Sequence, residues 1–451
     1  MSLDGPPANQ SSQLQASAPE PPARIPTDQS AFGTESDPLS GHLNHLSSSQ
    51  SEALDSFKKE CIERTLYRPA EGAKSASHSD ATLLRFLRAR RFDVNGALDQ
   101  FAATEKWRKE NQIELLYENI DIDSYETSRR VYPQWTGRRD RRGIPIYVYV
   151  IRDLNSKNMA EYTSKTSHTS ISKTHASSNV PARLLRLFAL YENMLEFVLP
   201  VCSRLDRPNP ETPIVNTTNI VDISGVGLKQ FWNLKGHMQD ASTLATAHYP
   251  ETLDRIFIIG APAFFPTVWG WIKRWFDPVT TSKIFILPAS EVKSTLSKFM
   301  DPANFPKQYG GELDWQWEDM PHLDEPAKAL IGSLERIGSD GDLPETGQPT
   351  GEEAKQEERQ KENVLEEGAA EKRRKSTFVR GPVVFRDGRM DIMGSHNGEA
   401  RRRTIAVPDI EAAGTEMNGN TKHLPVDEDE KLELSSNGAA KESSRSPVAS
   451  A

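Results

Sequence analysis

Short apolar segments that alternate with helix-like segments dominate the middle of this 451-residue chain. The apolar segments are rich in β-branched and aromatic residues, a composition typical of buried strands, and they cover residues 144–151, 214–223, 255–260 and 284–287. Residues 184–199 and 228–237 have the pattern of helices between them. Strands that alternate with helices favour a largely parallel sheet with helices on its faces. The predicted fold class is therefore α/β.

A group of helices precedes the predicted sheet, and polar segments flank the folded part. Asp80 is a suitable N-cap for a helix over 81–90, and a second helix is predicted over 94–107; the first carries a basic rim of Arg85, Arg88, Arg90 and Arg91. Because hydrophobic residues make up only 36% of the chain, much of it cannot belong to a packed core. We expect disordered segments at 1–50 and 325–451, a helical lobe at 51–115 and an α/β lobe at 116–324.

The composition also excludes several classes of protein. The net charge of −9 gives no case for nucleic-acid binding by the chain as a whole. The two cysteines, Cys61 and Cys202, are far apart, which favours a reducing compartment over a disulfide-rich scaffold. The N-terminal residues lack the apolar segment of a secretory signal, and prolines interrupt the most apolar run, 256–272, so we predict no bilayer-spanning helix. We therefore expect a cytoplasmic protein.

Motifs for catalysis and metal binding are weak or absent in the sequence. Residues 222–227 follow a predicted strand and begin like a dinucleotide fingerprint, but Gln230 occupies the position of the third glycine. The sequence contains no G-x-S-x-G elbow, no P-loop and no Cys/His cluster with zinc spacing. We expect no enzyme activity, no catalytic residues, no metal and no cofactor.

Two apolar helices and one polar loop carry the positive signal. Residues 184–199 are apolar almost all round, and 263–272 are equally apolar. Both segments fit core helices, and both also fit helices that cover an apolar cavity. In the latter case the segment 263–272 could press against a bilayer. Between the helix stop at Asp277-Pro278 and the strand at 284–287 lie three hydroxyl groups and Lys283. This arrangement suits a phosphorylated ligand with an apolar body, and an ordinary surface loop fits it as well.

Several motifs, in order along the chain, resemble those of the CRAL-TRIO family, and in particular of the secretory phosphatidylinositol/phosphatidylcholine transfer proteins. The first is LLRFLRARRFDV at 83–94 with EKWRK at 105–109, and the others are YPQ at 132–134, LPVCSR at 199–204, YPE at 249–251 and 277–287. The resemblance covers about residues 51–320. It implies a helical lobe on a mostly parallel sheet that forms the floor of one phospholipid pocket, and a mobile helix, at roughly 265–275, that gates it.

The resemblance also implies the residues of the pocket. The phosphatidylinositol headgroup site maps onto Arg90, Glu251, Thr280 and Lys283, where Arg90 either contacts the headgroup or pairs with Glu251 and holds the site in shape. The choline-lipid site matches less well: a family tyrosine is replaced by Thr136 and a family hydroxyl by Asn219, so phosphatidylinositol is the preferred ligand and phosphatidylcholine a second candidate. The remaining implied residues are Tyr147, Tyr191 and Thr217 at the choline-lipid site, Phe264, Phe265, Trp269, Trp271 and Lys273 on the gate, and Asp277 and Pro278 at the hinge.

The function implied is a non-enzymatic, monomeric carrier that extracts a phospholipid and transfers it between membranes, in support of phosphoinositide metabolism and vesicle trafficking. Peripheral association with Golgi or endosomal membranes is expected. Two alternatives remain: a lipid sensor or scaffold that binds a partner through its tails, and a carrier of another hydrophobe such as a sterol. The basic clusters at 372–375 and 401–403 adjoin Ser376, Thr377 and Thr404, which are candidate kinase sites.

Overall fold

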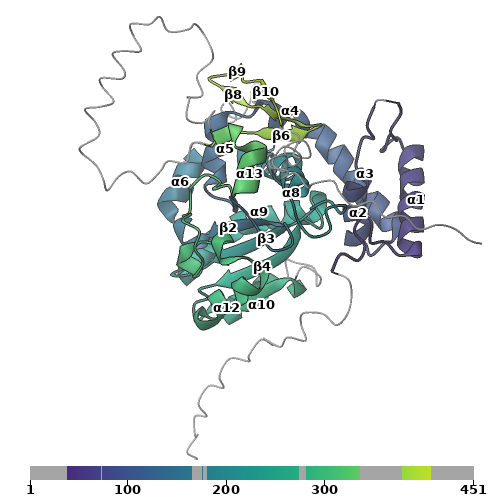
Figure 1. The fold of residues 1–451 in the computed structure, drawn as a ribbon. Helices are drawn as coiled ribbons and strands as arrows, with labels where there is room; N and C mark the ends of the chain where they lie inside the picture. Colours follow the sequence, from purple (N-terminus) through teal and green to yellow (C-terminus); the bar gives the residue numbers. More distant parts are fainter. Residues whose placement is uncertain are drawn as a thin grey trace, which may run out of the picture. The chain divides into compact units, whose positions relative to one another are not determined.

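A five-stranded mixed sheet forms the centre of the structure, a computed structural model that describes residues 38–72, 74–164, 175, 180–273, 281–335 and 378–407 (Figure 1). Its strand order is β1-β2-β3-β4-β5. The first pair is antiparallel and the other three pairs are parallel. The strands are β1 (Gln134–Arg139), β2 (Pro145–Val150), β3 (Thr217–Asp222), β4 (Leu253–Ile259) and β5 (Ile284–Leu287). The predicted α/β class with a mostly parallel sheet is confirmed.

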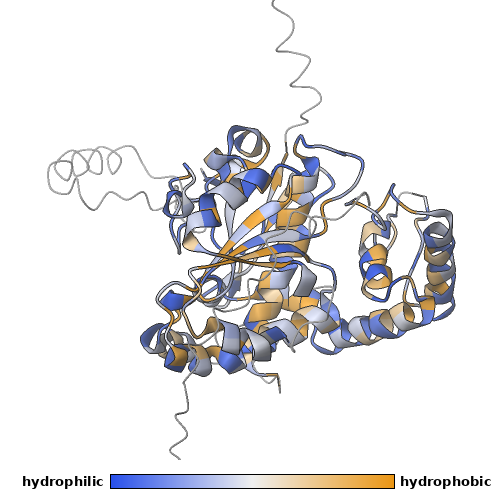
Figure 2. Ribbon diagram, turned by 90° about the horizontal axis from the view of Figure 1, so that it is seen from below, coloured by the Kyte–Doolittle hydropathy of each residue, from blue (hydrophilic) through white to orange (hydrophobic). Residues whose placement is uncertain are grey.

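Alternate residues of the strands divide between two apolar clusters, as the twofold period of a strand requires. One face of the sheet packs on α12 (Val292–Phe299) and the residues that follow it, through Ile146, Val148, Ile220, Phe257 and Leu287. The other face presents Tyr149, Val221, Ile256, Ile258 and Ile284 to the helices that surround the candidate site. Both faces are therefore covered, which explains the apolar runs within β2, β4 and β5; Figure 2 shows apolar segments among the central strands.

The N-terminal helices α1 (Ser48–Glu63), α2 (Asp80–Ala89) and α3 (Val94–Glu110) pack around a core of their own, which includes Phe57, Leu83 and Phe101. The N-cap of α2 is Ser79, which accepts a hydrogen bond from the backbone N–H of Thr82, so the predicted cap at Asp80 is wrong by one residue. The expected disorder up to residue 50 is also wrong for residues 38–50, because turns and the start of α1 occupy them.

The remaining helices cover the sheet and its ends. The helix α6 (Ser156–Ser164) follows β2 in the chain. The other helices are α4 (Ile113–Asn119), α5 (Ile122–Arg129), α7 (Ala182–Asn193), α8 (Leu199–Arg204), α9 (Leu228–His248), α10 (Phe265–Ile272) and α13 (Glu325–Ile331). No helix among the described residues combines the length and the apolar character needed to cross a bilayer.

Pro200 does not end the apolar helix that precedes it. Helix α7 continues through the π-helical segment η5 (Met194–Val198) directly into α8, where Pro200 lies in the first turn. Because proline has no backbone N–H, the hydrogen-bond ladder is interrupted where it lies. The wide π turn provides this break in the hydrogen-bond ladder, and such turns are frequent at functional sites.

Helix α13 and a small C-terminal sheet contradict the expected disorder for residues 325–335 and 378–407. The strands of this sheet are β6 (Val383–Arg386), β7 (Arg389–Ile392) and β10 (Arg403–Ala406), in the order β10-β7-β6, with a separate hairpin of β8 (Ser395–His396) and β9 (Glu399–Ala400). Phe378, Val383 and Met390 are buried against Phe197 of η5 and Leu330 of α13. The average composition of the long tail is polar and gives no sign of these few apolar residues. Their packing partners are far away in the sequence.

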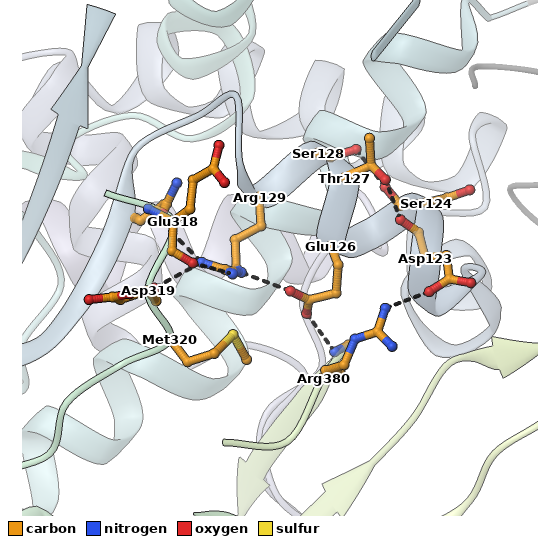
Figure 3. A network of polar contacts seen from close by, with 12 residues as sticks. Asp123, Ser124, Glu126, Thr127, Ser128, Arg129, Glu318, Asp319, Met320 and Arg380 are labelled. Atoms are coloured by element: carbon orange, nitrogen blue, oxygen red, sulfur yellow. Dashed lines mark hydrogen bonds and ion pairs between the residues drawn. The ribbon is translucent and has the colours of Figure 1, made fainter. Parts of the chain in front are cut away.

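Polar contacts fasten this C-terminal segment to α5 (Figure 3). The backbone N–H of Gly381 donates to Glu126 Oε1 at 2.9 Å, while Arg129 donates to Oε2 of the same carboxylate at 2.9 Å. Arg380 pairs with Asp123 at the start of the helix. Glu126 therefore holds the C-terminal segment and Arg129 together, with both of its oxygens in use.

Candidate functional site

A cavity of about 450 Å³ lies between helices α7, α9 and α10 and the face of the sheet that carries Tyr149 and Ile258. Apolar side chains line most of it, including Leu187 and Leu190 of α7, Phe231 and Met238 of α9, and Ile258 of β4. The charged residues of the lining are Arg88, Arg90, Arg91, Glu251 and Lys283, and the ion-paired group of Arg88, Glu251 and Lys283 defines the polar end of the cavity. An apolar body with convergent polar groups at one end is the usual form of a small-molecule site, and it fits an amphipathic ligand.

Glu251 is the centre of the polar end. It lies in the turn between α9 and β4 and adopts a left-handed backbone conformation with φ of 57°. Lys283, directly before β5, brings Nζ to 3.2 Å from Glu251 Oε2 and to 3.0 Å from the backbone oxygen of Leu253. Arg88 Nη2 lies 3.7 Å from the same carboxylate oxygen. Two cations from separate elements therefore share one carboxylate.

Arg88 is a cation of the polar end that the headgroup site predicted from the sequence does not include. The helical pattern places it on the basic rim, but the resemblance selects Arg90, which lines the cavity from the C-cap of α2. The Arg88 side chain is only 9% exposed, and burial lowers its pKa, an effect that Glu251 and Asp254 oppose. The alternative role proposed for Arg90, pairing with Glu251, thus belongs to Arg88.

A buried network behind Glu251 holds the turn in place. Arg108 of α3 forms a bidentate pair with Glu192 of α7, at 2.7 and 3.0 Å, and Tyr249 donates its hydroxyl to Glu192 Oε1 at 2.8 Å. Burial would lower the pKa of Arg108, but the carboxylate of Glu192 raises it above its usual value. The sequence analysis missed this network. A carboxylate inside the apolar segment 184–199 is the feature that could have revealed it. The network positions Tyr249 and, two residues later, Glu251.

The four residues of the implied choline-lipid site all line the cavity. Asn219 Nδ2 donates to Thr217 Oγ1 at 2.9 Å, and Thr217 in turn donates its hydroxyl to the backbone oxygen of Thr252 at 3.1 Å. Tyr191 stacks on Tyr249, with ring centroids 4.5 Å apart and planes 10° from parallel. The donors of Thr217 and one face of Tyr191 are therefore engaged within the protein.

The implied gate corresponds to α10, and its side chains divide between two environments. Phe264, Phe265 and Trp269 line the cavity. Trp271 and Lys273 are exposed instead, and Trp271 meets Trp232 of α9 edge to face, with centroids 6.0 Å apart. Three predicted residues, Asp277, Pro278 and Thr280, lie outside the described residues. In the part of the chain that the structure describes, no group of three or more metal-ligating side chains is present.

Comparison with known proteins gives consistent matches. The CRAL/TRIO domain matches residues 129–311, and the CRAL/TRIO N-terminal domain matches residues 53–103. The Sec14 cytosolic factor of Schizosaccharomyces pombe is 32% identical over 272 residues, which are 60% of this chain and 85% of that protein. The SEC14 cytosolic factor of Kluyveromyces lactis is 31% identical over 277 residues, 61% of this chain and 82% of that protein. The phosphatidylinositol/phosphatidylcholine transfer protein SFH9 of Arabidopsis thaliana is 29% identical over 265 residues, 58% of this chain and 41% of that protein.

Proposed function

The chain belongs to the CRAL/TRIO domain family, and from this premise we propose that it binds one phospholipid in its cavity and transfers that lipid between membranes. The observation that carries the proposal is the apolar cavity with Glu251, Lys283 and Arg88 at one end. The apolar walls suit acyl chains, each buried methylene of which contributes about 0.8 kcal/mol. The name of the Arabidopsis relative, a phosphatidylinositol/phosphatidylcholine transfer protein, supports the same class of ligand.

Phosphatidylinositol fits the polar end best. A phosphodiester needs a cation and hydrogen-bond donors, which Lys283 and Arg88 supply, with Thr280 as a further hydroxyl by resemblance to the family. An inositol ring offers hydroxyl donors, and Glu251 is a suitable acceptor for them. When the headgroup enters, its phosphate pairs with Lys283 and its hydroxyls bond to Glu251. Both charged side chains therefore keep a partner although their mutual ion pair weakens.

Phosphatidylcholine is the weaker candidate. In the family pattern, two hydroxyls hold the phosphate of the choline lipid, and here one of those positions is Asn219. The amide of Asn219 donates to Thr217, whose own proton goes to a backbone oxygen, so neither side chain turns a free donor toward a phosphate. Binding would require these buried hydrogen bonds to break, at a cost of about 1 kcal/mol each.

The sensor or scaffold remains the second candidate because of one observation. The C-terminal segment 378–407 packs on η5, which continues the cavity-lining helix α7, and Tyr117 bonds both Val383 and Asn193 there. Of the candidate kinase sites, Thr404 is exposed on β10 and bonds Asp391, beside which a phosphate would be repelled; Ser376 and Thr377 lie outside the described residues. Our first proposal is a carrier that acts as a monomer, without catalysis, at the cytoplasmic face of Golgi or endosomal membranes.

Native mass spectrometry with lipid extraction, on the full chain purified from cells, tests the proposal. We expect a one-to-one complex that releases phosphatidylinositol. A protein that carries a sterol or another neutral hydrophobe would overturn the headgroup assignment. A protein that holds no lipid at all would contradict the carrier function itself.

A further inference from the structure

The exposed large hydrophobic side chains of the described residues are concentrated beside the cavity. Trp232 is 56% exposed, Leu228 51% and Trp271 46%, and all three lie on α9 or α10. Two others, Ile62 at 45% and Leu115 at 40%, lie elsewhere, on α1 and α4. Single exposed apolar residues are ordinary, but a cluster that includes two tryptophans marks an interaction surface.

The cluster has a defined geometry. Leu228 and Trp232 are one helical turn apart on α9 and therefore share a face, onto which Lys235 also falls. The Lys235 ammonium lies 5.3 Å from the centroid of the Trp232 ring, and Trp271 of α10 packs edge-on against the same indole. The two helices thus present one continuous aromatic surface to solvent.

Other residues of the same two helices line the cavity. They are Phe231 and Met238 of α9, Trp269 of α10 and the N-cap of α10, Phe264. The exposed surface therefore lies on the two helices that wall the space of the proposed lipid.

The charge of this surface is uniformly positive. Lys229, Lys235 and Lys273 are exposed around the aromatic residues. The sequence contains no Asp or Glu between Ser224 and Gln239, nor between Gly260 and Lys273. Tryptophan with lysine is the combination that enters the headgroup region of an anionic bilayer, where the ring lies at the interface and the ammonium pairs with lipid phosphate.

Helix α9 is fixed to the body of the protein. Gln230 donates to the backbone oxygens of Ile151 and Arg152 at 3.1 and 2.9 Å, and a ring nitrogen of His237 lies 3.1 Å from the backbone oxygen of Val131. We propose that the outer face of α9, formed by Leu228, Trp232 and Lys235, docks the protein on an anionic lipid surface, with Trp271 beside it. The sequence-based gate placed membrane contact on α10 alone. This inference rests on the proposed function, since the docked membrane is the one that exchanges lipid with the cavity.

Sedimentation with vesicles tests the inference on the full chain. The probe is phosphatidylcholine vesicles with about 20 mol% phosphatidylserine, compared with pure phosphatidylcholine vesicles. We expect Trp232→Ala to weaken binding to the anionic vesicles by about tenfold or more, whereas the control Ile62→Ala, at another exposed apolar residue on α1, binds like the parent. Lys235→Glu should weaken binding to the anionic vesicles and leave binding to the neutral ones unchanged.

The outcomes separate this inference from the proposed function. Native mass spectrometry should find the same bound lipid in Trp232→Ala as in the parent, because Trp232 is not among the cavity-lining residues. Unchanged vesicle binding by both Trp232→Ala and Lys235→Glu would overturn the docking surface and leave the carrier function standing. A parent protein that is a dimer by light scattering, and that Trp232→Ala converts to a monomer, would assign the surface to a second copy instead. If Trp232→Ala fails to fold, Lys235→Glu, a change at an exposed residue, decides the question.

Discussion

Replacing Lys283 by Ala removes the cation that meets Glu251 at the polar end of the cavity. Lys283 Nζ is 3.2 Å from the carboxylate, and the two side chains are 24% and 20% exposed. An ion pair of partial exposure contributes about 0–1 kcal/mol to stability, so the variant should unfold within a few degrees of the parent. Arg88 remains 3.7 Å from Glu251, so the carboxylate is not left without a cation.

The effect on ligand binding should be larger than the effect on stability. A hydrogen bond from an ammonium to a phosphodiester contributes about 1.5–3 kcal/mol, which corresponds to a loss of roughly 10- to 150-fold in affinity. Because Lys283 is partly exposed, we expect the lower part of that range. The lost affinity should be specific to lipids whose phosphate lies at this end, so transfer of phosphatidylinositol should fall while the apolar walls remain intact.

The assay is transfer of labelled phosphatidylinositol between donor and acceptor vesicles, together with a thermal melt of each protein. The matched control is Lys106→Ala, which removes a lysine from a pair with Glu110 on the surface of α3, away from the cavity, where the side chain is 76% exposed. We expect the control to transfer like the parent. Normal phosphatidylinositol transfer by Lys283→Ala would refute the headgroup site. Equal losses in both variants would point to a general effect of charge on membrane binding.

Three further predictions concern selectivity, stability and pH. Asn219→Thr should raise the proportion of phosphatidylcholine among bound lipids, as measured by lipid extraction, because it restores the second hydroxyl of the family pattern; an unchanged lipid profile would contradict the donor argument. Tyr117→Phe should lower the free energy of unfolding by about 1–3 kcal/mol in denaturant titrations, because its buried hydroxyl bonds the backbone of Val383; no change would show that the C-terminal sheet is held without it. Burial, and to a lesser extent Arg108, lower the pKa of His248 from 6.5 to about 4. The contribution of this histidine to stability is therefore complete above pH 6.5. It is lost as the pH falls toward 4, because the unfolded chain takes up a proton first. Melting temperatures across that range should fall less steeply for His248→Phe than for the parent.

Local pattern accounts for the parts of the fold that the sequence predicted. Strands β2 to β5 contain apolar runs and alternate with helices, so their parallel order follows from short-range information alone. Strand β1 is polar and antiparallel to β2, and its sequence carries no such signal. The C-terminal sheet has no such signal. Val383, Val384 and Phe385 form one short apolar run in a polar tail, and their partners are Tyr117 and η5, more than 180 residues earlier. Burial across such a separation is decided by tertiary packing.

The candidate site shows the same division. Family motifs identified Glu251 and Lys283, which the structure brings together although 32 residues separate them. The motif could not distinguish Arg88 from Arg90. Because α2 ends at Ala89, Arg90 leaves the helix as its C-cap, and the direction of its side chain no longer follows the helical period. Arg88 lies in the last turn of α2, where the directions of side chains still follow the helical period, and it projects toward Glu251.

The two ends of α9 separate lipid selection from membrane docking. The helix has 21 residues and rises about 30 Å, with Leu228 and Trp232 in its first turns and Glu251 just beyond its C-terminus. A phospholipid with its headgroup at Glu251 therefore lays its acyl chains along the inner side of α9, past Met238, toward Phe231 and α10. Changes at the polar end should alter which lipid is bound, and changes at Trp232 should alter how fast any bound lipid exchanges with a membrane. A double variant of Lys283 and Trp232 should then show additive losses in the free energy of activation for transfer, because the two sites are too far apart to share a contact.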